Sequence, residues 1–441
     1  MKDLVASIVS PTEADEYVPG HGDLSFDVRS YALEIDYAVD GNRLDGRAVI
    51  TAEAADDLDT FDLDLRGLRA TKVAVKRFGV DRFSHVRGKL HVKLSRPIPS
   101  GTTFEVVVAY GGKPAPVRSR WGTVGWEELT DGSLVAAQPS GAPSWFPCND
   151  RPSDKASYSF EITAPSDYTV VANGDPTGRR RRASSTTWTF DQPEPMATYL
   201  ATVQIGRYET RTSTASGVEQ RHVAPVALRA SYDADFERQP AMLATFAEHF
   251  GPYPFGSYTV VVTADDLEIP LEAQGLSIFG ANHLDGHRGL ERLVAHELAH
   301  QWFGNSLTLS TWDQIWLHEG FACYAEWIWS EASGGPSTHE KALEHWGRLA
   351  ELPQDVVVGD PGPELMFDDR VYKRGALTLH ALRRTVGDDA FFEMLRGWTA
   401  ARRHGTVTTE AFVKHAEAST GASLRDLLAQ WLDAEPLPRL P

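Results

Sequence analysis

The spacing of apolar residues changes once along the 441-residue chain, and this change limits the folds open to it. Before about residue 215, apolar and polar residues alternate in short runs separated by Gly, Pro, Asn and Ser, which is typical of half-buried β-strands. After about residue 235, apolar residues recur every three or four positions, the period of an α-helix. We therefore predict an α+β protein with an all-β domain over residues 1–214 and a mainly helical domain over residues 215–441.

The same periodicity gives the approximate bounds of the elements. Strands are expected at residues 26–39, 47–52, 60–65, 72–75, 89–94, 103–110, 158–163, 168–172 and 186–190. Helices are expected at residues 237–250, 289–303, 313–330, 337–349, 371–386, 388–402, 408–420 and 423–431. The basic run 179–182 follows a Gly/Pro turn, so we expect it at the solvated tip of a hairpin.

Charge and cysteine content exclude several classes of partner. The chain has 43 basic and 61 acidic residues, a net charge of −18, which repels nucleic acid and anionic lipid. No apolar run approaches the roughly 18 residues of a membrane span, and the N-terminus lacks the apolar core and cleavage site of a signal peptide. Two cysteines, Cys148 and Cys323, are too few for a disulfide framework. We expect a soluble cytoplasmic protein.

One predicted helix contains a pattern that binds metal ions. Within residues 289–303 stands His296-Glu297-Leu298-Ala299-His300. Residues four apart lie on one face of a helix, about 6 Å apart along its axis, so both imidazoles can reach a single zinc ion. Glu297 lies beside the metal, where it can act as a base on zinc-bound water.

The next predicted helix offers a third ligand. Glu319 follows His300 by nineteen residues, and two histidines with one glutamate leave the fourth zinc position open, as in catalytic sites. Glu326 lies on the same helical face as Glu319 and is a candidate to orient a ligating imidazole. The alternative for Glu326, a surface glutamate with no special role, stays open at this point.

Here the sequence resembles a known family. HELAHQWFGN (296–305) and WLHEGFA (316–322) resemble the motifs of the M1 aminopeptidases, zinc enzymes of the gluzincin clan that remove N-terminal residues from peptides. The resemblance spans about residues 25–432 and includes QPSGAPSWFPCNDRPSDKASYSFEI (138–162), MATYL (196–200), PYPFGSY (252–258), LEAQG (271–275) and VYKRGA (371–376). It implies a thermolysin-like catalytic domain, one zinc ion per chain and peptide substrates with a free N-terminus.

The resemblance also implies roles for three further residues. Glu272 corresponds to the family's glutamate that holds the substrate's α-ammonium, and Gln138 to the polar residue that the β-domain adds to this amine site. Tyr372 corresponds to the tyrosine whose hydroxyl assists the oxyanion. Ile269 and Pro270 stand where the family has Gly-Ala, and proline offers no backbone N–H to a bound peptide.

Two other departures from the family pattern have consequences. His318 stands where the family usually has Asn, and its position about 100° around the helix from Glu319 favours packing or hydrogen bonding over ligation. Large family members continue into a helical domain that covers the active site. This chain ends after the last helix of the catalytic domain, so we expect an open cleft with weak discrimination by peptide length.

Three functions remain to be distinguished. An aminopeptidase needs Glu272 and Gln138, whereas a zinc endopeptidase on the same core would need neither and would accept blocked N-termini. An epoxide-hydrolase side activity occurs on this fold, but nothing in the sequence favours it. A non-catalytic peptide-binding protein ranks last, because all three ligand candidates and the base are present. The oligomeric state and the preferred N-terminal residue do not follow from the sequence.

Overall fold

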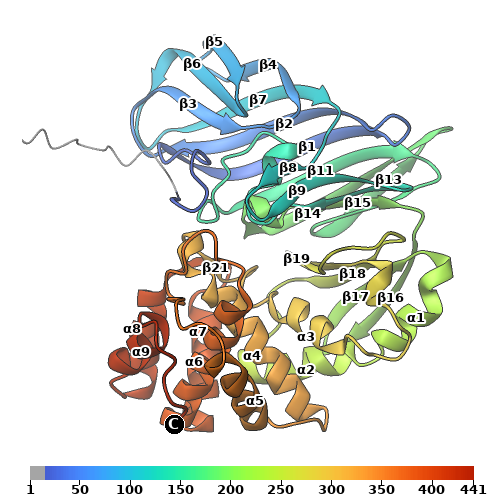
Figure 1. Cartoon of the computed structure of the whole chain (residues 1–441). Coiled ribbons are helices and arrows are strands. Elements are labelled where there is room, and N and C mark those ends of the chain that lie inside the picture. The colour runs from blue at the N-terminus through green and yellow to red at the C-terminus, as the bar shows by residue number, and fades with distance from the viewer. Residues whose placement is uncertain (1–14) are drawn as a thin grey trace, which may run out of the picture.

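Strands fill the N-terminal half of the chain, and helices most of the C-terminal half, in a computed structural model that describes residues 15–441 (Figure 1). The strand-rich layer lies on one side of the molecule and the helices on the other. The expected fold class is therefore confirmed. Most of the N-terminal segment on which the expectation about a signal peptide depends lies outside the described residues.

The core of the β-domain is a seven-stranded sheet in the order β13-β14-β11-β1-β2-β7-β4. Its central strand β1 pairs in parallel with β11, although more than a hundred residues separate them, and antiparallel with β2. Alternate side chains of these strands are buried, as the period-2 pattern requires. The strands are β1 (Phe26–Ala38), β2 (Arg43–Ala54), β4 (Arg69–Val75), β7 (Thr103–Gly112), β11 (Ala156–Pro165), β13 (Asp175–Arg181) and β14 (Ser185–Met196).

Two smaller sheets complete this domain. One has the order β3-β6-β5 and the other β12-β15-β10-β9-β8. In the second sheet, strand β10 ends two residues before Gln138, and the side chain of Gln138 contacts Glu272 of the helical domain. The strands are β3 (Leu58–Asp64), β5 (Val80–Val86), β6 (Lys89–Ile98), β8 (Val117–Ser119), β9 (Gly122–Leu129), β10 (Gly132–Ala136), β12 (Thr169–Ala172) and β15 (Val203–Gly206).

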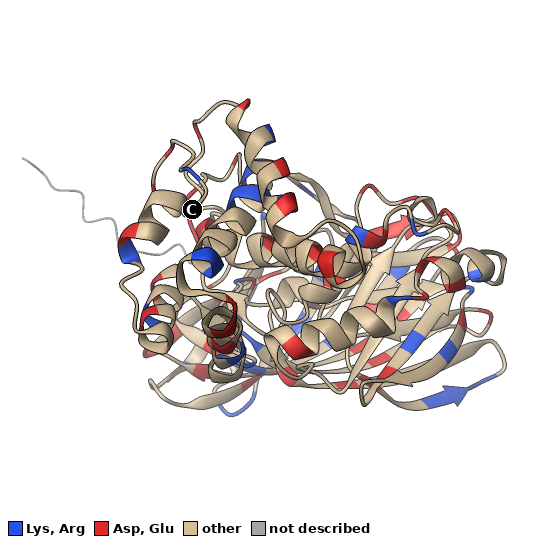
Figure 2. Ribbon diagram, turned by 90° about the horizontal axis from the view of Figure 1, so that it is seen from below, with Lys and Arg blue, Asp and Glu red and all other residues tan. Residues whose placement is uncertain are grey.

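The basic run 179–182 is solvated, as expected, but most of it is strand rather than turn. Arg179 to Arg181 belong to β13, the exposed edge strand of the large sheet, and Arg182 begins the turn to β14. In Figure 2 this segment is the blue strand at the right-hand edge. Long charged side chains on an edge strand discourage pairing with another sheet.

The C-terminal domain combines one five-stranded sheet with nine helices, all counted within residues 15–441. The sheet has the order β16-β17-β18-β20-β19, with β16 (Glu209–Ala215), β17 (Val218–Ala224), β18 (Ser257–Val262), β19 (Leu271–Ala273) and β20 (Leu276–Phe279). The helices are α1 (Arg229–Asp235), α2 (Gln239–Phe250), α3 (Glu291–Ala299), α4 (Trp316–Ala332), α5 (Thr338–Ala350), α6 (Asp369–Val386), α7 (Asp388–Ala401), α8 (Thr409–Thr420) and α9 (Arg425–Leu432). A short pair, β21 (Thr308–Leu309) and β22 (Thr406–Val407), joins two loops.

All eight predicted helices are present within a few residues of their expected bounds. The strand β16 hydrogen-bonds only to β17 of the C-terminal sheet, so we propose to divide the domains between Gly206 and Glu209, slightly before the expected residue 214. No helix of the described part of the chain is both long and apolar enough to cross a membrane.

The two domains share one apolar core and are also joined by a partly buried lysine. Lys155, at the start of β11, donates through Nζ to the carbonyls of Asn305, Ser306 and Gly405 at 3.0, 2.9 and 3.4 Å. Two of these carbonyls belong to the loop that directly follows the predicted metal-binding helix. The β-domain therefore holds this loop in place.

Candidate active site

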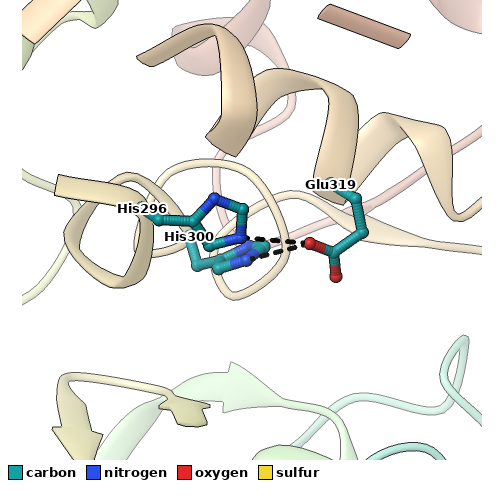
Figure 3. A group of neighbouring side chains, drawn as sticks. All are labelled: His296, His300 and Glu319. Atoms are coloured by element: carbon teal, nitrogen blue, oxygen red, sulfur yellow. Dashed lines mark hydrogen bonds and ion pairs between the residues drawn. The ribbon is translucent and has the colours of Figure 1, made fainter. Parts of the chain in front are cut away.

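The three predicted metal ligands meet at one buried point. His296 lies on α3, His300 directly follows that helix, and Glu319 lies in the first turn of α4. Glu319 Oε2 is 3.2 Å from His296 Nε2 and 3.4 Å from His300 Nε2. Figure 3 shows the two imidazoles and the carboxylate pointing toward one another.

The other nitrogen of each imidazole is also occupied. His296 Nδ1 donates to Glu326 Oε1 at 2.8 Å, and His300 Nδ1 donates to the carbonyl of Phe303 at 3.0 Å. Hydrogen bonds of this kind fix the ring orientation and leave both Nε2 atoms free to face a metal ion. Glu326 is buried against His296, which does not fit a surface glutamate without partners.

The electrostatics of this point favour a positive charge. Burial lowers the pKa of His296, but hydrogen bonds to Glu319 and Glu326 outweigh it and raise the pKa to about 10. Burial also lowers the pKa of His300, but the nearby Glu319 carboxylate outweighs it, and the pKa rises to about 9. Burial alone would raise the pKa of Glu319, yet the two imidazoles hold it below its usual range. In the absence of a metal ion, the two imidazoles therefore bind protons at the position that a metal cation would occupy.

These donors fit zinc. One nitrogen from each histidine and one oxygen of Glu319 lie within 4.8 Å of one another, and all three residues are buried. Two imidazoles and a carboxylate are the donor set of catalytic zinc sites, in which a fourth position is left for water. The described residues therefore supply the three protein ligands of such a site.

Glu297, the residue predicted to act as a base, lines the same cavity as the three ligand candidates. Burial raises the pKa of its carboxyl to about 8, because the loss of water outweighs the opposing effect of the His296 and His300 imidazoles. Its Oε2 is buried and has no hydrogen-bond partner among residues 15–441. An unpartnered buried carboxylate is available for a proton from a substrate or a water molecule.

Gln138 and Glu272 come together from different domains. Gln138 follows β10 of the β-domain, Glu272 lies on the edge strand β19, and Gln138 Nε2 donates to Glu272 Oε1 at 2.5 Å. Burial raises the pKa of the Glu272 carboxyl. This pairing of an amide with a partly buried carboxylate creates a polar pocket next to the metal ligands.

The strand carrying Glu272 is fastened to the metal-binding helix by two residues of the HELAHQWFGN segment that the sequence analysis did not single out. Gln301 accepts from the Gly275 N–H at 2.8 Å and donates to the Ala273 carbonyl at 3.2 Å. Asn305 donates to the same Ala273 carbonyl at 2.9 Å. The presence of two amide side chains within this segment was the sequence signal that could have indicated this positioning role.

Tyr372 lies in the first turn of α6, which Asp368 caps by accepting from the Arg370 N–H. Its ring stacks on His296, with centroids 6.1 Å apart and planes 14° apart. Burial and the carboxylates nearby raise the pKa of the Tyr372 hydroxyl well above its usual value, so the hydroxyl keeps its proton. It is therefore available as a hydrogen-bond donor.

All eight residues predicted for the site line one cavity of about 140 Å³: Gln138, Glu272, His296, Glu297, His300, Glu319, Glu326 and Tyr372. Arg292 and Lys373 also line it and were not predicted. His318 lies outside the cavity lining, buried, with Nε2 accepting from the Leu309 N–H at 2.8 Å. Cys148 and Cys323 are buried and unbonded to each other.

Comparison with known families agrees with this geometry. The Peptidase M1 N-terminal domain matches residues 29–200 and the Peptidase family M1 domain matches residues 234–431. The chain is 26% identical over 328 residues to aminopeptidase M1-A of Oryza sativa subsp. japonica, which covers 69% of this chain and 37% of that protein. It is 28% identical over 314 residues to aminopeptidase N of Lactococcus lactis subsp. lactis, covering 65% and 37%. The chain thus spans little more than a third of these relatives.

Solved structures include relatives of the same length. An M1 zinc metallopeptidase from Deinococcus radiodurans is 32% identical, with a TM-score of 0.90, and the match covers 97% of this chain and 98% of that one. A mutant of that enzyme bound to a Tyr-Ser-Ala substrate matches with a TM-score of 0.90 over 97% and 99%. With both domain models matched in order and a full-length structural relative at this identity, the chain belongs to peptidase family M1.

Proposed function

We propose that this protein is a zinc-dependent aminopeptidase that removes the first residue from peptides with a free α-amine. The observation that carries the proposal is the shared cavity, in which the Gln138–Glu272 pair faces the three metal ligand candidates. A carboxylate is suited to bind the partly protonated α-amine, whose pKa is about 8. An anchor for the α-amine in the same cavity as the metal ligands places the first peptide bond next to them.

His296, His300 and Glu319 would hold one zinc ion per chain, and Glu326 would orient His296. When bound, zinc acts as a Lewis acid that polarises the substrate carbonyl and makes water more acidic. The donor set supports zinc over magnesium or calcium, which prefer oxygen ligands only.

The protein's own side chains account for the proton movements. Glu297 accepts the proton of the attacking water at its unpartnered Oε2 and returns it to the leaving amine. The Tyr372 hydroxyl donates a hydrogen bond to the oxygen that becomes negative in the transition state. Glu272 and Gln138 hold the ammonium in place while these steps occur.

The test compares a panel of fluorogenic aminoacyl amides with the same panel N-acetylated, both with zinc-loaded protein. We expect cleavage of the free-amine panel alone, and its loss with a chelator. Cleavage of both panels would favour an endopeptidase, a result that the Pro270 substitution in the anchor loop would help to explain. If neither panel is cleaved although metal analysis confirms bound zinc, the proposed aminopeptidase activity on these substrates is overturned.

The compartment remains part of the proposal. Both cysteines are buried and unbonded, which is what a protein of the reducing cytoplasm requires. Peptides with free N-termini would be its partners, and the net charge of −18 argues against nucleic acid.

A further inference from the structure

A second cleft, of about 680 Å³, adjoins the catalytic cavity on the side of the amine anchor. The two share Gln138, Ile269 and Tyr372. A third cleft, of about 540 Å³, adjoins the cavity elsewhere and shares Arg292, Glu326 and Lys373 with it, but neither Gln138 nor Glu272. If Glu272 holds the ammonium, the side chain of the first residue has the cleft beside Gln138 available to it, and the rest of the peptide leaves by the other side.

The cleft beside Gln138, here called the anchor-side cleft, carries only one sign of charge. No lysine or arginine is among its lining residues, whereas five acidic side chains are: Glu127, Asp266, Glu268, Glu364 and Asp368. The cleft on the other side is lined by both signs, with Arg292, Lys341, Arg348 and Lys373 among its residues. The excess of negative charge at the anchor-side cleft is therefore local and does not simply follow from the overall charge.

Two of the five acidic side chains already form ion pairs with arginines of this chain. Glu364 Oε1 accepts from Arg120 at 2.9 Å, and Asp368 is held by both ends of the Arg370 guanidinium. Glu127, Asp266 and Glu268 form no ion pair with any residue in the range 15–441. These three carboxylates are left to interact with whatever enters the cleft.

Glu127 is the best protected of the three, because Asp266 and Glu268 are exposed on the loop before β19 whereas Glu127 is partly buried on β9. Burial raises the pKa of its carboxyl, and no cation offsets this effect. A positive group placed in the cleft would stabilise the ionised form. Its neighbour Glu128 points to the opposite face of the same strand and hydrogen-bonds to Asn42.

The cleft also has a rigid aromatic wall. Trp121 Nε1 donates to the Pro363 carbonyl at 2.8 Å, and the ring packs edge-on against Phe367 with centroids 6.0 Å apart. The Arg120 guanidinium already lies over the Trp121 ring, with its Cζ 5.6 Å from the ring centroid, so the wall is suited to the hydrocarbon stem of a long side chain rather than to its charged end. The wall alone would equally accept leucine or phenylalanine, so the carboxylates decide the charge preference.

We propose that the anchor-side cleft binds the side chain of the substrate's first residue and selects arginine or lysine, with Glu127 as the principal specificity-determining carboxylate. This inference rests on the proposed aminopeptidase function and names its substrate class. The stem lies along Trp121 and Phe367, and the charged end meets the three carboxylates that have no partner.

The unmodified protein tests the charge preference directly. Arginyl and citrullinyl amides have nearly the same shape but differ by one charge, and lysyl and norleucyl amides form a second pair. We expect kcat/KM to favour arginine over citrulline by about ten-fold or more in low salt, with the ratio falling as salt is added. A ratio near one would overturn the proposal, as would a ratio that salt does not change.

A variant pair assigns the effect to Glu127. Glu127→Gln should lower the arginine-to-citrulline ratio several-fold, whereas the control Glu128→Gln, which removes the same charge one residue away on the other face, should leave it unchanged. Equal ratios in Glu127→Gln and the unmodified protein would overturn the assignment of Glu127.

A leucyl amide separates this inference from the proposed function. If leucyl, arginyl and citrullinyl amides are all cleaved and the last two at equal rates, the aminopeptidase stands and the charge preference fails. If none of the free-amine amides is cleaved by zinc-loaded protein, the proposed function itself fails.

Discussion

The two domains contribute to the same cavity in different ways. The helical domain supplies the metal ligand candidates and Glu297 from two helices that lie close together in sequence, so a short motif encodes them. The β-domain supplies Gln138 to this cavity and Glu127 to the adjoining anchor-side cleft, from a loop and a strand that reach these places only because the domains pack together. This difference supports the proposal that the chemistry resides in one domain and that the other contributes to substrate selection. Single substitutions in each domain test this division of roles.

Glu297→Gln should have the largest effect. The amide cannot accept a proton, so we expect kcat to fall by about 10³-fold or more, near the upper part of the range for a lost general base. The ligands are untouched, so bound zinc should stay at one per chain by metal analysis. Full activity in the variant would contradict the role of Glu297 and the assignment of the chemistry to this helix.

Tyr372→Phe removes one hydroxyl and keeps the ring on His296. We expect kcat to fall by about 10²-fold with little change in KM, because the hydroxyl contacts the oxyanion only in the transition state. Steady-state kinetics with one good substrate measures both constants. A rise in KM at constant kcat would instead place Tyr372 in ground-state binding.

Glu326→Gln tests support of the metal site from within the helical domain. Loss of the charged partner of His296 Nδ1 should weaken zinc binding by about 10- to 100-fold. A competitive chelator titration gives the affinity, and excess zinc should restore most of the activity. If affinity is unchanged, the contact between Glu326 and His296 does not tune the metal.

Gln138→Ala, the only one of these changes in the β-domain, should have the smallest effect. It removes one polar partner of the amine site, so kcat/KM for free-amine substrates should fall by about ten-fold, mainly through KM. The zinc content serves as the control and should not change. A loss of kcat comparable to that of Glu297→Gln would contradict the division between the domains.

The parts of the molecule that depend on local geometry could be predicted from the amino-acid sequence. Helical periodicity located all eight predicted helices, and the four-residue spacing of His296 and His300 places both on one helical face whatever surrounds them. Short edge strands such as β5 and β8 were missed, because a few exposed residues carry no clear period.

The pairs of residues that meet across the domains could not be predicted in this way, because they depend on the packing of the whole chain. Gln138 and Glu272 are 134 positions apart and join through the packing of β10 against β19 and the metal-binding helix. Lys155, Glu127 and the aromatic wall of Trp121 and Phe367 belong to no motif, and their places follow from segments more than a hundred residues away in the sequence. The sequence determines local periods and spacings directly, whereas such distant contacts depend on how complete domains fit together.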